Sequence, residues 1–205
     1  MGFWGKLWQA APSLTQFAAM LVLGIDPGTH NLGWGLVDGE ANRMKHVAHG
    51  VIRAGEGLSL AARLVVIEEH LARVISEYKP IAGSVESLFF HKDPQAAAKL
   101  GHARGVVLLC LQRDAVGVFE YPPAQVKSAI VGNGRALKPQ VAQMVRRLLC
   151  LDETPQADAA DALALAITHL RRAPIAEALA RRSTLTGALP AVLLQRRKRA
   201  PRARF

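Results

Sequence analysis

The order in which the hydrophobic periodicity changes along the chain is the feature that most restricts its fold. Apolar runs typical of strands come first, over residues 21–25, 32–37 and 43–53. Three strands joined this closely predict an antiparallel meander. Asp38-Gly39, between the second and third runs, is a dipeptide typical of a hairpin turn.

From residue 58 the apolar side chains recur every three or four positions, which predicts an amphipathic helix that Lys79-Pro80 ends. Strands and helices then alternate. The expected strands are residues 81–85 and 116–121, and the expected helices are residues 94–113, 123–131, 139–149 and 157–172. This order predicts an α/β fold whose mixed five-stranded sheet has three antiparallel strands plus two parallel ones, flanked by helices.

Composition excludes several other classes of protein. Of the 205 residues, 50% are hydrophobic and 20% are charged, which excludes a disordered or fibrous chain. No apolar run reaches the roughly 18 residues that a membrane span needs. Cys110 and Cys150 form neither a disulfide framework nor a metal-binding pair, which is typical of the reducing cytoplasm.

The net charge of +10 is concentrated at the carboxyl end, where Glu177 is the only acid after residue 170. We therefore divide the chain into a domain at residues 21–172 and a basic C-terminal tail at residues 173–205. The tail predicts an arm that binds a polyanion such as nucleic acid; the alternative is a solvated tail that aids solubility.

Residues 1–20 form an N-terminal extension that fits a secretory signal poorly, because Lys6 is its only charge and polar residues interrupt its apolar region. We interpret it as an upstream extension, with Met20 as the native start. An amphipathic surface helix is the alternative.

Four carboxylates stand on elements that otherwise read as core. Asp26 and Glu86 each follow an apolar strand, and Asp158 and Asp161 lie on one face of a helix of Ala, Leu and Ile. Each alone has a structural explanation, such as a turn cap, an ion pair with an arginine or a favourable charge at a helix start. Together they predict convergence at one sheet edge, where carboxylate oxygens hold hard divalent cations.

Five ordered blocks over about residues 21–169 resemble the RuvC family of Holliday-junction resolvases. The blocks are Leu23-Gly24-Ile25-Asp26-Pro27-Gly28, Val85-Glu86-Ser87-Leu88-Phe89-Phe90, Lys99-Leu100-Gly101-His102-Ala103-Arg104-Gly105, Gly132-Asn133-Gly134-Arg135-Ala136 with Lys138 and Gln140-Val141, and Ala157-Asp158-Ala159-Ala160-Asp161-Ala162-Leu163-Ala164. Their number and order make the resemblance specific.

The resemblance implies a ribonuclease-H-like fold and a homodimeric, magnesium-dependent endonuclease of DNA recombination and repair. It would resolve four-way (Holliday) junctions by paired symmetric nicks that leave 5′-phosphate and 3′-hydroxyl ends. The family's catalytic and metal-binding acids fall on Asp26, Glu86, Asp158 and Asp161. They would hold two Mg²⁺ ions per subunit, for which Mn²⁺ substitutes, about 3.5–4 Å apart. A branch-migration motor complex is the implied protein partner.

The resemblance also implies DNA contacts. Phe89 matches an aromatic residue that stacks on a junction base, although adjacent aromatics such as Phe89 and Phe90 are more often buried. Lys127 and Lys138 match basic residues facing the DNA backbone, and we include Arg135 of the same block with them.

Three other functions compete with this interpretation. Asp26-Pro27-Gly28-Thr29 resembles the phosphate loop of actin-like kinases and ATPases, but those proteins need a second such domain. A related nuclease could act on other branched DNA. A protein of the same fold could bind DNA without cutting it, although the complete set of four acids favours a nuclease.

Overall fold

The computed structural model describes residues 20–40, 43–87 and 94–185 of the chain. The chain divides into two compact units, residues 1–172 and residues 173–205. The strands and the candidate site belong to the first unit, which is described here by itself.

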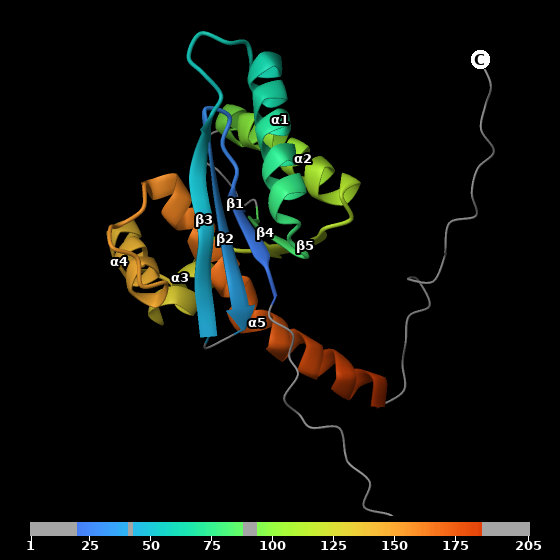
Figure 1. Cartoon of the computed structure of the whole chain (residues 1–205), viewed down its shortest axis with the longest axis vertical. Coiled ribbons are helices and arrows are strands. Elements are labelled where there is room, and N and C mark those ends of the chain that lie inside the picture. Colours follow the sequence, from blue (N-terminus) through green and yellow to red (C-terminus); the bar gives the residue numbers. More distant parts are fainter. Residues whose placement is uncertain (1–19, 41–42, 88–93, 186–205) are drawn as a thin grey trace, which may run out of the picture. The chain divides into compact units, whose positions relative to one another are not determined.

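Five strands form one mixed sheet in the order β3-β2-β1-β4-β5 (Figure 1). The central strand β1 (Val22–Asp26) pairs antiparallel with β2 (Asn31–Glu40) and parallel with β4 (Ala82–Glu86). The outer strands are β3 (Arg43–Arg53), antiparallel to β2, and β5 (Gly117–Tyr121), parallel to β4. The predicted sheet of three antiparallel and two parallel strands is therefore confirmed.

The predicted turn at Asp38-Gly39 is wrong. Both residues continue β2, where Asp38 lies opposite Lys45 and Gly39 lies opposite Met44. Gly39 has a φ of 133°, a conformation that glycine adopts without a steric cost. The dipeptide thus extends the strand, and β2 is longer than the apolar pattern indicated.

Helices cover both faces of the sheet. On one face lie α1 (Leu60–Tyr78) and α2 (Pro94–Arg113), and on the other lie α3 (Pro123–Val131), α4 (Lys138–Leu148) and the first part of α5 (Ala157–Leu185). Figure 1 shows α1 and α2 on one side of the strands and α3 and α4 on the other. Each face therefore has its own hydrophobic core.

Alternate residues of β1 supply the two cores. Val22 packs against α3, α4 and α5, whereas Leu23 and Ile25 pack against α1 and α2. All three are fully buried. Burial on both faces is why β1 reads as a continuous apolar run rather than as an alternating one.

Helix α1 begins and ends where the sequence predicts. The Ser59 hydroxyl accepts a hydrogen bond from the Ala62 backbone N–H, which caps the start of the helix. Lys79 ends it in the left-handed conformation, with a φ of 50°. None of the described helices is long and apolar enough to cross a membrane.

Helix α5 extends to Leu185, beyond the predicted end at Arg172. Pro174 lies inside this helix, although proline removes a backbone donor. The alanines and leucines that follow it favour helix, and the helix continues through the proline.

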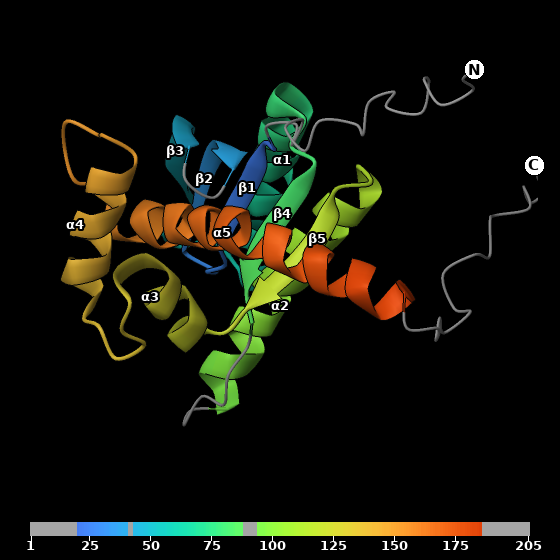
Figure 2. The same ribbon diagram turned by 90° about the horizontal axis from the view of Figure 1, so that it is seen from below.

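Helix α5 packs with its backbone directly against the centre of the sheet. Figure 2 shows it running across β1 and β2. A Cβ atom at Gly24 would overlap the carbonyl oxygen of Ala162 and lie 2.8 Å from the backbone nitrogen of Ala166. Glycines on the strand and alanines on the helix thus let the two backbones touch.

Two polar contacts fix the position of α5 along the sheet. The buried hydroxyl of Ser84, on β4, donates a 2.8 Å hydrogen bond to the Leu165 carbonyl oxygen. The Tyr121 hydroxyl, on β5, lies 2.9 Å from Nδ1 of His169, and burial lowers the pKa of that imidazole to about 4. His169 is therefore a core residue of α5 that stays uncharged at neutral pH.

We predict that Gly24→Ala lowers the free energy of unfolding by about 3 kcal/mol, because the added methyl collides with backbone that cannot give way. The matched control is Gly105→Ala on α2, where a Cβ would meet nothing within 4 Å. That change should be neutral or stabilise by up to about 1 kcal/mol, since alanine favours helix. Urea denaturation measures both. Equal unfolding midpoints for the two variants would contradict the close packing of α5.

Candidate active site

Two of the four predicted acids lie side by side at one edge of the sheet. Strands β1 and β4 are parallel, with Ile25 opposite Val85, so the next residues along, Asp26 and Glu86, end neighbouring strands at the same edge. Adjacent strands lie about 4.8 Å apart, which brings these two side chains within reach of one another.

Helix α5 brings the other two acids to the same edge. A Cβ atom at Gly33 would overlap the carbonyl group of Asp158 and lie 3.1 Å from the backbone nitrogen of Ala159. Gly33 is also the residue that pairs with Asp26 across β1 and β2. The absence of a side chain at Gly33 therefore lets the start of α5, with Asp158 in its first turn and Asp161 one turn further along, approach Asp26.

The four carboxylates interact electrostatically. The pKa of Asp26 is raised to about 7, first by burial and then by the negative charges of Asp161 and Glu86, with a smaller effect from Asp158. The positive charge of Lys138 opposes this rise. A carboxyl group that resists ionisation because it is buried and other acids surround it is typical of a catalytic or cation-binding centre.

Lys138 joins this group from the start of α4. Its Nζ donates a 2.6 Å hydrogen bond to Oδ2 of Asp161. That bond is the largest effect raising the pKa of Lys138, and attraction to Asp161, Asp26 and Glu86 adds to it. The ammonium group therefore partly neutralises the acidic cluster, as a bound cation would.

The donor set fits a hard divalent cation, because carboxylate oxygens are the ligands that Mg²⁺ binds. The repulsion that raises the pKa of Asp26 is also the repulsion that such a cation relieves. In the described part of the chain, no three His, Cys, Asp or Glu side chains are already arranged to enclose an ion. Cation binding would therefore draw the carboxylates closer together and compete with Lys138 for Asp161.

No contact with the acids is described for Arg135 or Lys127, and Phe89 lies outside the described residues. Arg135 is exposed in the loop between α3 and α4, where its backbone N–H donates to Oδ1 of Asn133. Lys127 is half-buried on α3. The predicted stacking role of Phe89 stays a prediction.

Two features of the site escaped the sequence interpretation. One is the role of Gly33 in admitting α5, which its place in the Gly33-Trp34-Gly35 repeat opposite Asp26 could have indicated. The other is a 3.0 Å hydrogen bond from Nη2 of Arg53 to Oε1 of Gln156, which ties the end of β3 to the residue before α5. No local pattern signals a contact between residues so far apart in sequence.

Comparison with known proteins identifies the family to which the chain belongs. The family described as crossover junction endodeoxyribonuclease RuvC matches residues 22–169. A protein of that name from Sorangium cellulosum is 58% identical over 161 residues, which cover 78% of this chain and 90% of the relative.

Solved structures give the same result. The structure of Thermus thermophilus RuvC in complex with a Holliday junction substrate aligns with a TM-score of 0.73 and 37% identity, over 77% of this chain and 96% of that one. The yeast mitochondrial Holliday junction resolvase, at 14% identity, aligns with a TM-score of 0.58 over 80% of this chain and 83% of that one, and shares the fold. The predicted family and the ribonuclease-H-like fold class are therefore confirmed.

The raised pKa of Asp26 predicts how Asp26→Asn changes the free energy of unfolding as the pH varies. Above about pH 7 the folded protein holds Asp26 as an ionised carboxylate, which is better solvated when the chain unfolds. Asp26→Asn should therefore stabilise the metal-free protein by about 1–3 kcal/mol at pH 8. The gain should be absent below about pH 4, grow as the pH rises and level off above about pH 7.

Thermal unfolding in the presence of a chelator, followed across this pH range, measures the effect. Asp152→Asn, which removes an exposed carboxylate outside the cluster, is the control and should change little. A destabilised Asp26→Asn protein at pH 8 would contradict the electrostatic account.

Proposed function

The chain belongs to the RuvC family of crossover junction endodeoxyribonucleases, and from that membership we propose that it resolves four-way (Holliday) DNA junctions in recombination and repair. The observation that carries the proposal is the convergence of Asp26, Glu86, Asp158 and Asp161 on one sheet edge, which follows from the strand register and from the close approach of α5 to Gly33. This arrangement suits hydrolysis of a phosphodiester, since the acids can organise cations around a phosphate.

Asp26 has the central role in this mechanism. It lies on the central strand between Glu86 and the start of α5, so it is the carboxylate that can bind a cation together with the acids on either side of it. In this proposal Glu86 and Asp161 complete the ligand set around Asp26, and Asp158 ligates or orients.

We propose two Mg²⁺ ions per subunit as the cofactor, with Mn²⁺ as a substitute, held by these four acids. When bound, they supply Lewis-acid activation of the scissile phosphate. Water would attack phosphorus in line and give up a proton to solvent, the bond to the 3′ oxygen would break, and that oxygen would take up a proton. The products are 5′-phosphate and 3′-hydroxyl ends, and no covalent bond to the protein forms.

Paired, symmetric nicks need two active sites, so the proposal includes a homodimer. Phe89 would stack on a junction base, and Lys127, Arg135 and Lys138 would contact the DNA backbone. A branch-migration motor complex would deliver the junction. The cytoplasm is the proposed location, in keeping with two free cysteines, Cys110 and Cys150.

We predict that Asp26→Asn lowers junction cleavage at least a thousandfold while junction binding stays within a fewfold, because only the carboxylate that links the two sides of the cluster is lost. Asp152→Asn should cut like the unchanged protein. The measurement is cleavage of a mobile four-way junction in Mg²⁺, with both strands followed on a denaturing gel and the product ends tested by ligation.

Symmetric, ligatable nicks support the proposal. Preferential cutting of flaps or forks would indicate a nuclease for other branched DNA, and junction binding without any cutting would indicate a DNA-binding protein of this fold. Near-normal cleavage by Asp26→Asn would contradict the assignment of the active site.

A further inference from the structure

Basic residues at the active-site end of the sheet have no role in the mechanism above. We infer that His30, Arg53 and Arg63 form a binding site for a backbone phosphate of the DNA strand beside the scissile phosphate. The inference rests on the proposed function for its ligand, a phosphodiester of the bound DNA. It is independent of whether that DNA is cut.

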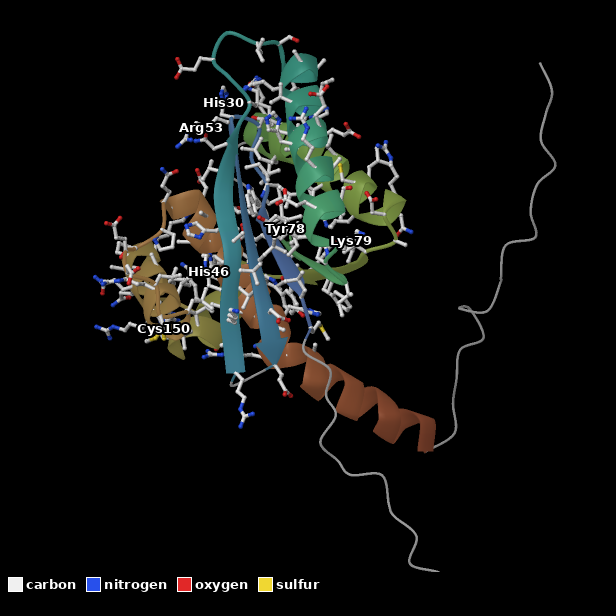
Figure 3. All side chains as sticks on the ribbon, viewed as in Figure 1. His30, His46, Arg53, Tyr78, Lys79 and Cys150 are labelled. Carbon is white, nitrogen blue, oxygen red and sulfur yellow. The ribbon has the colours of Figure 1, made fainter. Side chains whose placement is uncertain are left out.

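Strand register places these residues next to the carboxylates. Asn31 at the start of β2 pairs with Arg53 at the end of β3, and the His30 carbonyl accepts a 2.9 Å hydrogen bond from the Ala54 N–H. Figure 3 shows His30 and Arg53 together at the same end of the sheet. Gly33 pairs with Asp26 on one side and with Val51 on the other.

These pairings set the distance to the active site. Val51 lies two strands from Asp26, and Arg53 is two residues further along β3. Strand spacing and rise then separate the Cα atoms of Arg53 and Asp26 by about 12 Å. This separation suits a phosphate one or two nucleotides from the scissile one, within reach of a long arginine side chain.

The contact between Arg63 and His30 fixes the proton on the imidazole. Nη1 of Arg63 lies 2.5 Å from Nε2 of His30. Because a guanidinium can only donate, Nε2 must accept, and the ring proton lies on Nδ1. Nδ1–H of His30 is then a donor for another acceptor. A histidine oriented in this way by an arginine is a preformed hydrogen-bond donor for an anion.

The guanidinium of Arg63 also includes a donor without a partner, because its Nε is buried and makes no hydrogen bond. A buried donor without a partner costs free energy, and such groups in folded proteins often belong to functional sites. Arg63 carries a full positive charge, because a guanidinium stays protonated in proteins, and its Nη1 contacts His30.

The positions of the basic side chains indicate that the ligand is a strand of DNA. Lys138 reaches the acids from α4, in the helix layer on one face of the sheet, and Arg63 comes from α1 in the layer on the other face. A polyanion crossing the carboxylates thus meets positive charge on both sides. Arginine pairs well with phosphate oxygens, and phosphate contacts position DNA without reading its sequence.

The experiment measures the salt dependence of junction binding by fluorescence anisotropy, with chelator present so that no cutting occurs. Arg63→Gln should weaken binding about tenfold and lower the slope of log K against log salt by about 0.9, the value for one lost phosphate contact. Arg53→Gln, which also removes the hydrogen bond to Gln156, should lower the slope similarly. The matched control is Arg73→Gln, an exposed residue further along α1, whose slope should equal that of the unchanged protein.

Two further measurements separate phosphate binding from a structural role. Arg63→Lys keeps the charge, so it should retain the salt slope while binding a fewfold more weakly. In ¹⁵N NMR spectra of the free protein His30 should carry its proton on Nδ1, and that resonance should shift when DNA is added. Thermal unfolding checks that each variant folds. If Arg63→Gln does not fold, the salt slope of Arg53→Gln tests the inference instead.

Unchanged salt slopes for Arg53→Gln and Arg63→Gln, or an equal loss for Arg73→Gln, would overturn the inference. So would a proton on Nε2 of His30. Failure of the proposed function looks different: the unchanged protein would not cut junctions in Mg²⁺, while the slopes would still fall in the two arginine variants.

Discussion

The contact between α5 and the two central antiparallel strands is the constraint on which the active site depends. Gly24 and Gly33 let the helix backbone touch β1 and β2, and any side chain at either position would push α5 outward. The distance between Asp26 and the acids of α5 is set by this contact. The glycines are therefore as necessary to the site as the carboxylates, although they have no chemistry of their own.

Gathering four acids destabilises the folded protein, and the rest of the structure offsets this. Burial and neighbouring negative charges raise the pKa of Asp26, which means that its ionised form is less stable here than in water. The buried hydrophobic residues on both faces of the sheet and the Lys138–Asp161 ion pair stabilise the arrangement. A site held in this way favours binding of positive charge, whether from Lys138 or from a metal ion.

Local pattern predicted most of the fold, and contacts between distant residues account for what it missed. Strand and helix periodicity located the sheet and its helices, and the misplaced carboxylates located the acids. The prediction of a turn at Asp38-Gly39 was wrong because pairing with β3 outweighs the local turn preference of that dipeptide. The contacts of Arg63 with His30 and of Arg53 with Gln156 join separate elements, so no sequence window contains them.

The most direct test of the account is a crystal structure of the protein soaked with Mn²⁺, in which anomalous scattering locates the ion. The account predicts an ion coordinated by Asp26 together with Glu86 or Asp161, with Lys138 withdrawn from its 2.6 Å contact with Asp161. An ion bound elsewhere, with Lys138 still paired to Asp161 and Asp26 unliganded, would contradict the claim that the close approach of α5 to the sheet builds a cation-dependent active site.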